Sequence, residues 1–325
     1  MSLVLFLVLV AAFALSLAVG DFTVPLGDLP GILFGASTGN STGAGAYVVT
    51  ELRLPRAVAG VLVGVAFGLG GALFQRLLRN PLASPDVIGV TQGASAAAVI
   101  CLELFGVSGA VLSAAALGGA LITGAVIYVL ARRGGVNGYR LVLIGVGVGA
   151  VLTSIVSYLM TWSDVTLAQQ ALVWLTGNLN GASWDKALPV AIALAVLVPA
   201  ALALSRSLTG LQLGDETAAG LGLRVERVRL LLLLVAAALT AFATAAAGPV
   251  AFVAFVANPI ATRLVGGARA GLVAPALTGA LVTLIGDFAA QHLLGAQLPV
   301  GVVTGAVGAP YLLWLLATAN RAGRV

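Results

Sequence analysis

Long apolar runs, separated by charged residues, prolines and glycine clusters, make up most of this chain. A helix that crosses the hydrocarbon core of a bilayer needs about 20 apolar residues. Cutting the sequence at the interruptions predicts ten membrane-spanning helices, over 3–20, 57–77, 88–104, 109–131, 141–161, 187–205, 229–247, 249–265, 270–290 and 299–318. The predicted fold class is therefore all-α. The eighth run is short and opens with Gly248 and Pro249, so we expect a broken or partly re-entrant helix there, covered by protein or a water-filled cavity.

The positions of the basic residues predict the orientation of these helices. Cytoplasmic loops of membrane proteins are enriched in Lys and Arg. If the N-terminus is cytoplasmic, thirteen of the sixteen basic residues fall in cytoplasmic loops or tails, and only Arg53, Arg56 and Lys186 fall outside. We therefore expect both termini in the cytoplasm, the N-in, C-in arrangement.

A single membrane domain over residues 1–325 is predicted, with a long external loop over 21–56 and a long cytoplasmic loop over 206–228. The first apolar run has an alternative interpretation as a cleaved signal peptide, because small residues lie near its end at 16–18. A signal peptide carries a basic region before its apolar core. No Lys or Arg precedes Arg53, which favours a membrane span.

Composition independently indicates lipid surroundings. The chain is 60% hydrophobic and 8% charged, whereas soluble domains are about 45–50% apolar and about 25% charged. So few charges cannot cover the surface of a water-soluble fold. The net charge of +5 raises nucleic-acid binding as an alternative, but the arginines are scattered between apolar runs and form no basic stripe. We therefore exclude nucleic acid as a partner.

Motifs for enzymatic chemistry are absent from the sequence. The only lysine, Lys186, does not follow a glycine-rich turn, so the chain has no P-loop. The only histidine, His292, rules out an HExxH zinc site, and no GxSxG occurs. The only cysteine, Cys101, rules out an internal disulfide, and we expect it to be a buried, inert thiol. We therefore predict no catalytic residue, no metal ligand and no cofactor bound by this chain.

One carboxylate within a predicted span, Asp287, has two interpretations. Ionisable groups inside a membrane are costly and often functional, as in proton relays. An ion-coupled transporter would be expected to show more such groups near mid-span. We therefore favour a paired or hydrated carboxylate near the outer end of the ninth span over a proton relay.

Glycine recurs at every fourth position in the second span, at Gly60, Gly64 and Gly68. This spacing puts the three residues on one helix face, where a neighbouring backbone can approach closely. The pattern predicts a helix-packing interface, either within the subunit or between subunits.

Four motifs occur in a fixed order along the chain. They are Leu52-Arg53-Leu54-Pro55-Arg56 with the following stretch to Gly89, the segment Leu213–Gly222, the segment Gly248–Val253, and the segment Leu298–Pro310. In these motifs the chain resembles the FecCD family, the permease subunits of ATP-binding-cassette (ABC) importers for iron siderophores, haem and vitamin B12. The resemblance covers about residues 50–318. It implies the vitamin B12 permease-like fold of type II ABC importers, in the plasma (inner) membrane of a prokaryote.

The segment from Asp215 to Gly222 predicts a short cytoplasmic helix of about two turns. Asp215 is well placed as an N-cap, Glu216 lies in the first turn, and Gly220 and Gly222 favour an end. From the residues alone, this helix is either a solvated connector or a docking element. The resemblance implies that Asp215, Glu216, Ala219, Gly220 and Gly222 form the coupling helix that sits on a separate ATPase subunit, which carries ATP and Mg.

Arg53 and Arg56 depart from the positive-inside pattern. Arginines outside are either interfacial anchors or contacts to a partner. The resemblance implies that they pair with acidic residues of a soluble substrate-binding protein and orient its docking. The family often has a third arginine before its Leu-Pro-Val-Gly motif, where this chain has His292. Relatives more usually have Pro at the position of Asn258 and Gln or His at the position of Pro259. We therefore expect the turn in this segment to differ from theirs.

A translocation pathway is predicted from small and hydroxyl-bearing residues, which leave room for a bulky solute. The candidates in the fifth span are Gly145, Gly147, Gly149, Ser154 and Tyr158. Asn178 and Asn180, between Trp174 and Trp184, are candidates at the external mouth. The tryptophans either contact substrate or anchor the chain at the membrane interface. This region resembles permeases for catecholate siderophores such as ferric enterobactin.

The expected protein is one of two permease subunits, in a homodimer or heterodimer, that move a ferric siderophore. Its expected partners are ATPase subunits, a soluble substrate-binding protein and membrane lipid. Haem and cobalamin are alternative cargoes. An ion-coupled secondary transporter and an intramembrane enzyme are the competing classes.

Overall fold

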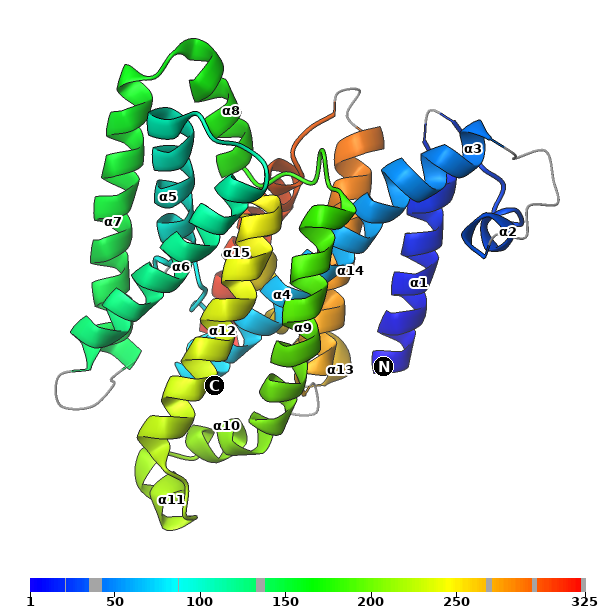
Figure 1. The fold of residues 1–325 in the computed structure, drawn as a ribbon. Coiled ribbons are helices and arrows are strands. Elements are labelled where there is room, and N and C mark those ends of the chain that lie inside the picture. Colours follow the sequence, from blue (N-terminus) through cyan, green and yellow to red (C-terminus); the bar gives the residue numbers. More distant parts are fainter. Residues whose placement is uncertain are drawn as a thin grey trace.

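The computed structural model describes residues 1–20, 22–34, 43–86, 88–132, 138–266, 271–293 and 297–322, and all regular structure in these ranges is helical (Figure 1). One helix occupies each of the ten predicted apolar runs. These helices are α1 (Ser2–Ala18), α4 (Leu54–Leu77), α5 (Val90–Phe105), α6 (Ala110–Ala131), α7 (Gly138–Trp162), α9 (Trp184–Ala203), α12 (Val225–Ala247), α13 (Val253–Val265), α14 (Val273–His292) and α15 (Val300–Ala322).

Shorter helices lie in the connections between them. These are α2 (Leu29–Leu33), α3 (Ala44–Tyr47), the π-helical η1 (Val48–Arg53), α8 (Val165–Leu175), α10 (Ser205–Gln212) and α11 (Asp215–Gly220). The predicted external loop over 21–56 is therefore partly helical, and its residues 21 and 35–42 lie outside the described ranges. The predicted cytoplasmic loop over 206–228 contains two short helices instead of one.

Within the described residues, six helical segments are long and apolar enough to cross a membrane. They are Ala44–Leu77, Ala110–Ala131, Gly138–Trp162, Trp184–Ala203, Val225–Ala247 and Val273–His292. The other four of the ten predicted spans, α1, α5, α13 and α15, contain shorter apolar helical segments. The prediction of an all-α chain is confirmed for the described residues, and six of their helical segments have the length and composition of membrane spans.

Helix α4 forms the centre of the bundle. It packs against α14, α12, α13 and α9, and most of its side chains are buried. Helices α5, α6 and α7 pack against one another at one side, and α1 packs on α14 at the other side (Figure 1). The main apolar core lies between these groups, around Phe67 and Leu73 of α4 and Leu239 of α12.

The glycine face of α4 packs on α14 as the spacing predicts. A Cβ atom on Gly64 would lie 2.5 Å from the carbonyl oxygen of Gly279, and one on Gly68 would overlap the backbone at Pro275. Gly60 faces the side chains of Leu179 and Leu284. In this structure the glycine face therefore lies against a helix of the same chain.

The predicted break in the eighth run is also confirmed. Helix α12 ends at Ala247, Gly248 has φ 71°, and Phe252 has φ 65° immediately before α13. Left-handed backbone at these two positions ends one helix and redirects the chain into the next. Helix α13 has 13 residues, about 20 Å of helix, which is shorter than the hydrocarbon core of a bilayer.

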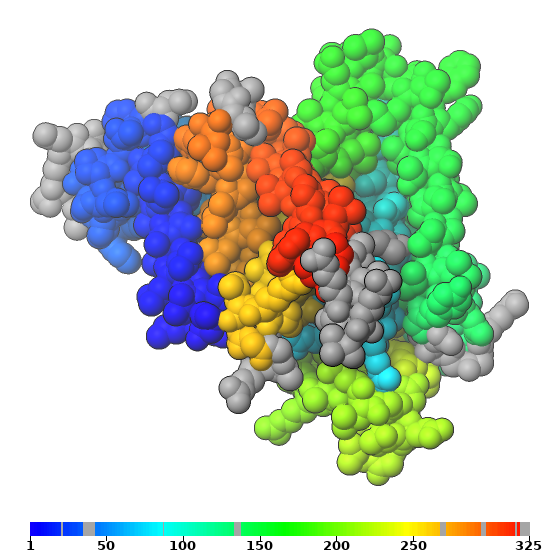
Figure 2. All heavy atoms as spheres, turned by 180° about the vertical axis from the view of Figure 1, so that it is seen from behind, coloured from blue at the N-terminus to red at the C-terminus, as the bar shows by residue number. Residues whose placement is uncertain are grey.

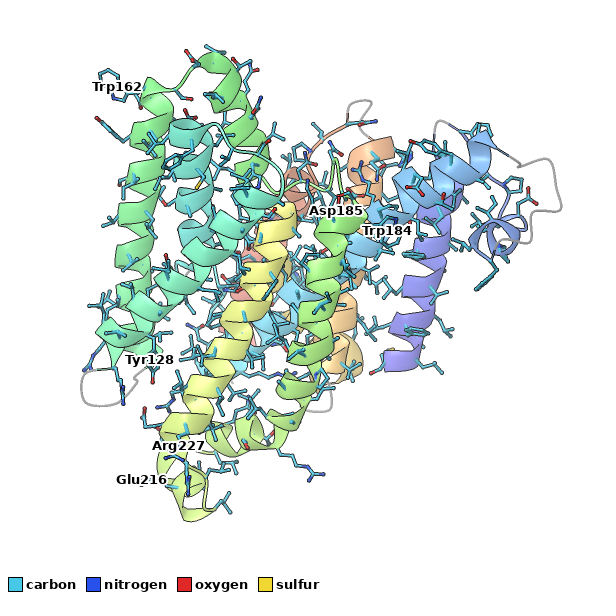
Figure 3. The ribbon with its side chains drawn as sticks, viewed as in Figure 1. Tyr128, Trp162, Trp184, Asp185, Glu216 and Arg227 are labelled. Atoms are coloured by element: carbon cyan, nitrogen blue, oxygen red, sulfur yellow. The ribbon has the colours of Figure 1, made fainter. Side chains whose placement is uncertain are left out.

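The two ends of the bundle carry different short helices (Figure 1). Helices α10 and α11 lie at one end, which we call the α11 end, and the N-terminus of α1 points the same way. Helices η1 and α8 lie at the opposite end, which we call the α8 end. In Figure 3, Glu216 and Arg227 lie at the α11 end, and Trp162, Trp184 and Asp185 lie at the α8 end.

Candidate functional site

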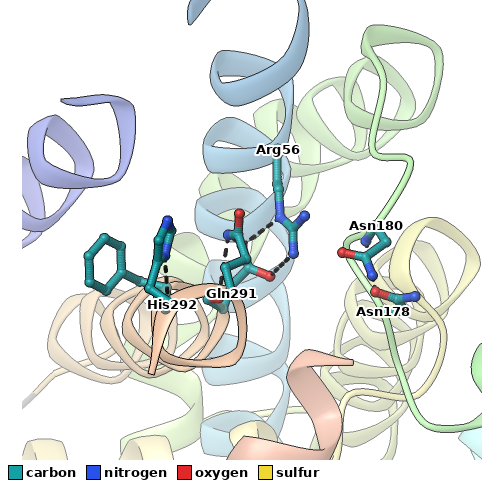
Figure 4. A network of polar contacts seen from close by, with 7 residues as sticks. Arg56, Asn178, Asn180, Gln291 and His292 are labelled. Atoms are coloured by element: carbon teal, nitrogen blue, oxygen red, sulfur yellow. Dashed lines mark hydrogen bonds and ion pairs between the residues drawn. The ribbon is translucent and has the colours of Figure 1, made fainter. Parts of the chain in front are cut away.

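A three-residue polar network at the α8 end joins α4 to α14. Arg56 donates from Nε and Nη2 to the two carboxylate oxygens of Asp287, both at 2.8 Å. Gln291, one turn further along α14, donates to the same carboxylate at 2.8 Å (Figure 4). The Arg56 side chain is 17% exposed and that of Asp287 is 4% exposed. Asp287 is therefore the paired carboxylate that we favoured over a proton relay.

Arg53 lies one turn earlier and binds backbone carbonyl groups. Its guanidinium donates to the carbonyl oxygens of Leu17 and Phe22, at 2.9 and 2.6 Å. The Leu17 carbonyl belongs to the last turn of α1, where helix carbonyls lack intrahelical partners and favour a cation. Both predicted docking arginines thus lie at the α8 end, opposite α11. Both belong to helices, η1 and α4, and both bind partners within the chain.

Three glycines from separate parts of the sequence, Gly177, Gly248 and Gly301, meet at the α8 end. The amide of Gly301 donates to the carbonyl of Gly177 at 3.0 Å, and the amide of Asn178 donates to Ala247 at 2.7 Å. Gly177 and Gly248 have φ values of 75° and 71°, and a Cβ on either would clash with neighbouring backbone. Glycine is required at this junction of α8, α12 and α15 because backbone meets backbone.

The predicted pathway residues of α7 divide between two faces of the helix. Gly145 and Gly149 are buried, and a Cβ on Gly145 would lie 2.5 Å from the carbonyl oxygen of Ile88. The room expected for a solute beside these two glycines is filled by the segment before α5. Gly147, Ser154 and Tyr158 are exposed on the other face.

Asn178 and Asn180 lie apart from the α7 candidates. The amide of Asn180 donates to Oδ1 of Asn178 at 2.8 Å. Both asparagines line a cavity of about 440 Å³ with Trp174, Gln169 and Gln170 of α8. The structure therefore does not combine the predicted residues into one pathway.

A cavity with several polar groups in a mostly apolar lining, which the sequence did not reveal, lies beside the N-terminus of α5. It has a volume of about 460 Å³, and its polar lining is Ser84, Asp86, Thr91, Gln92 and Ser95. Phe252, Phe255 and Leu312, from α15 and the start of α13, supply the apolar wall. Seen from behind, α15 and α7 lie on either side of the cyan segment that contains α5 (Figure 2). In the sequence, only Asp86 pointed to this cavity, as a charged residue in the motif that ends at Gly89.

Burial governs the protonation of Asp86, in the connection between α4 and α5. Desolvation raises its pKa to about 6, and the hydrogen bond with Thr91 acts in the opposite direction. Desolvation dominates because a charged carboxylate loses more solvation than one hydroxyl returns. Asp86 thus titrates closer to neutral pH than an exposed aspartate.

At the α11 end, Asp215 has a different role from the predicted N-cap. Gly214 is the N-cap residue, and no side chain caps the helix. The Asp215 carboxylate instead accepts two bonds from Arg229 of α12, at 2.8 and 2.9 Å. Arg79, which follows α4, lies 4.0 Å from the same carboxylate and donates to the carbonyl of Leu211. Asp215 therefore ties α11 to α12 and to the end of α4.

The exposed surface of α11 is formed by the remaining predicted residues. Glu216, Ala219 and Gly220 are exposed, and nothing lies within 4 Å of a Cβ built on Gly220. Gly222 has φ 82° and turns the chain toward α12. Ala218 is buried against the rest of the chain. The helix is thus fixed on one side and open on the other.

The surroundings of three further side chains, Cys101, His292 and Trp184, can be compared with the sequence analysis. Cys101 is half-buried instead of fully buried. His292 stacks on Phe288 with the ring centroids 4.6 Å apart. Trp184 is 44% exposed, which fits an interfacial anchor. Among the described residues, no group of three His, Cys, Asp or Glu side chains is arranged to hold a metal ion.

The chain is similar to known transport proteins along nearly its whole length. The profile of the FecCD transport family matches residues 8–318. The ferric enterobactin transport system permease protein FepG of Escherichia coli (strain K12) is 43% identical over 290 residues, which cover 89% of this chain and 88% of the relative. The achromobactin transport system permease protein CbrC of Dickeya dadantii (strain 3937) is 40% identical over 319 residues, covering 97% of this chain and 90% of the relative.

A solved structure shares the fold. It is an inward-facing conformation of a metal-chelate type ABC transporter, with a TM-score of 0.87 and 26% sequence identity, covering 98% of each chain. The sequence thus matches transport permeases along nearly the whole chain. The matched part includes the glycine junction at the α8 end and the exposed short helix at the α11 end. This protein belongs to the FecCD transport family.

Proposed function

We propose that this chain is the membrane permease subunit of an ATP-driven importer that carries a ferric siderophore across the plasma (inner) membrane of a prokaryote. The similar permeases from E. coli and D. dadantii are named for ferric enterobactin and achromobactin, which supports a siderophore cargo. Haem and cobalamin are the alternative cargoes of the same family.

The proposed topology has ten spans with both termini in the cytoplasm. The α11 end is then cytoplasmic and the α8 end external. Arg79 and Arg229 lie at the α11 end with α11, in accord with the excess of basic residues on the cytoplasmic side of membrane proteins. Arg53, Arg56 and Lys186 lie at the external end.

The observation that carries the proposal is the open face of α11. A six-residue helix is too short to be stable alone, yet here it is held by ion pairs and presents Glu216, Ala219 and the bare backbone of Gly220. Such a face fits a groove on another protein. We propose that this partner is an ATPase subunit, which binds ATP and Mg, and that this chain binds no cofactor.

At the external end, Arg53 and Arg56 are proposed to orient a soluble substrate-binding protein. Guanidinium groups at this end would attract acidic residues on the binding protein, and the guanidinium of Arg56 would have to be shared between Asp287 and these residues. In this proposal Asp287 and the carbonyls of α1 hold the arginines in place for docking.

A second permease subunit is proposed to cover α7 and α15. Helix α7 exposes large apolar residues, including Val151 and Ile155. A homodimer or heterodimer pairing along this face would enclose a pathway between the subunits. Gly147, Ser154 and Tyr158 remain the pathway candidates on α7, and Asn178 and Asn180 the candidates near the external mouth.

Reconstitution in proteoliposomes tests this function. The purified chain is combined with its ATPase, its second subunit and its binding protein, and uptake of radioactive iron as ferric enterobactin is measured. Uptake that requires ATP and continues after the proton gradient is dissipated supports the proposal. Uptake without the ATPase, driven by a proton gradient, would instead identify an ion-coupled transporter.

A further inference from the structure

A hollow formed by two adjoining cavities lies at the α8 end, lined by residues of α6, α9 and α12. It consists of two cavities of about 400 and 440 Å³. The two cavities share the lining residues Gly109, Ser113, Lys186, Ala245 and Ala246. We call it the α6–α9 hollow. Figure 3 shows Asp185 and Trp184 at the end of α9, beside the end of α12.

One part of the α6–α9 hollow is polar. Its lining includes Gln169, Gln170, Asn178, Asn180 and Lys186. The Nζ atom of Lys186 donates to the carbonyl of Gly181 at 3.1 Å, which leaves an ammonium group with further N–H donors. Oδ1 of Asn180 is buried and has no hydrogen-bond partner among the described residues. This oxygen is covered by the protein and does not face the hollow, so the Lys186 ammonium is the polar group here that a ligand can reach.

The other part of the hollow is apolar and lies deeper along the helices. Ala114, Leu117, Val190 and Phe242 form much of its wall. These residues lie one or two turns from the α8 end of α6, α9 and α12. Next to them on α9, Leu188 and Ile192 are 60% and 58% exposed, as expected of side chains that face lipid. An occupant of the whole hollow must therefore be amphipathic.

The charges at the boundary between the two parts restrict the occupant further. Asp185 and Lys186 are adjacent in sequence, both line the hollow, and they carry opposite charges. A ligand matched to them carries one negative and one positive group. Trp174 also lines the hollow, and Trp184 lies at the end of α9, as aromatic residues do at the membrane–water interface.

We propose that the α6–α9 hollow binds a phospholipid with a phosphate and a primary amine in its headgroup, the chemistry of phosphatidylethanolamine. Lys186 binds the phosphate, and the exposed carboxylate of Asp185 accepts hydrogen bonds from the ammonium group. An acyl chain lies along Leu117, Val190 and Phe242. The proposal depends on the membrane location of the chain and not on its cargo, and it places lipid instead of cargo beside Asn178 and Asn180.

Lipid binding to the delipidated, purified full-length chain tests this proposal. Phosphatidylethanolamine, phosphatidylcholine and phosphatidylglycerol are added separately, and bound lipid is measured by native mass spectrometry together with the unfolding temperature. We expect phosphatidylethanolamine to bind at least tenfold more tightly than phosphatidylcholine, whose quaternary ammonium has no N–H donor. Equal binding of these two lipids, or tighter binding of phosphatidylglycerol, would overturn the proposal.

Two variants assign the contacts. Lys186→Gln should weaken phosphatidylethanolamine binding at least tenfold, and Asp185→Ala should reduce the preference over phosphatidylcholine while leaving the chain folded. Arg206→Gln, an exposed cation at the opposite end, is the matched control and should bind lipid as the original chain does. Unchanged lipid binding in both test variants contradicts the proposal. So does a Lys186→Gln variant that loses only its affinity for the soluble binding protein, since the hollow would then be a protein-docking surface.

Discussion

The guanidinium of Arg56 and the carboxylate of Asp287 form a two-bond ion pair, with both contacts at 2.8 Å, across 231 residues of sequence. The pair joins the first turn of α4 to the last turns of α14. The same two helices pack closely through Gly64 and Gly279. One helix pair at the centre of the bundle thus combines close backbone packing with a largely buried ion pair.

Removing one member of this pair should destabilise the protein. Asp287→Ala leaves the Arg56 charge largely buried without its partner, which costs about 3 kcal/mol and should lower the unfolding temperature of the purified chain. Glu51→Ala, at an exposed acid of η1, is the control and should change little. The exchanged variant Arg56→Asp with Asp287→Arg should recover part of the loss. An Asp287→Ala variant as stable as the control would show that the pair contributes nothing.

Charge reversal at Arg53 and Arg56 should abolish siderophore uptake. Glutamates at both positions would repel the acidic residues that we propose on the binding protein. Binding of that protein to the reconstituted subunit should be lost, and in the original chain it should weaken as salt rises. Because both arginines also hold helices together, the variant must still be recovered in the membrane with its ATPase. Unchanged uptake would exclude docking through these residues.

A methyl group on the glycine face of α4 should be costly. Gly64→Ala would place a Cβ atom 2.5 Å from the carbonyl oxygen of Gly279, and overpacking of this kind costs about 1–3 kcal/mol. The control is Gly118→Ala on α6, where nothing lies within 4 Å. There, alanine should stabilise the helix by up to about 1 kcal/mol. Equal unfolding temperatures for the two variants would contradict the close contact seen between α4 and α14.

Bulky basic residues on α11 should prevent assembly with the ATPase. Glu216→Arg with Gly220→Arg fills the open face of the helix, while the Asp215–Arg229 pair that positions α11 is left intact. We expect the ATPase to be absent from the co-purified complex. Arg206→Glu on the neighbouring α10 serves as the control and should retain the ATPase. Retained assembly of the α11 variant would refute the coupling helix.

Asp86 should make stability depend on pH. Its pKa is raised to about 6 from an ordinary value of 3.8, so the folded chain binds the proton more tightly than the unfolded chain. Stability from this group is then fully present below about pH 4, falls as the pH rises, and is lost above about pH 6. Asp86→Asn removes this slope. Unfolding temperatures of the two proteins should differ least near pH 4 and most near pH 7, and parallel curves would contradict the raised pKa.

The sequence could predict the helices and some of their contacts because the relevant signals are local. Apolar runs of sufficient length determine where helices form in a membrane, and each of the ten predicted runs contains one. The spacing of Gly60, Gly64 and Gly68 indicated a packing face because helix geometry places every fourth residue on the same side. Gly248 and Pro249 likewise marked a break in the chain. None of these predictions required knowledge of a distant residue.

The partners of the charged side chains were decided only by the tertiary structure. Asp215 looked like an N-cap because its nearest neighbours in sequence begin a helix, yet the fold places Arg229 and Arg79 around it. Gly145 and Gly149 looked like open space in a pathway, but the segment before α5 fills that space. Whether an ion pair forms or a gap is filled depends on which helices pack together, and such helices can be far apart in the sequence. The local spacing of residues carries no information about this packing. The sequence by itself determined the helices and the family, and the packing of those helices decided which side chains meet.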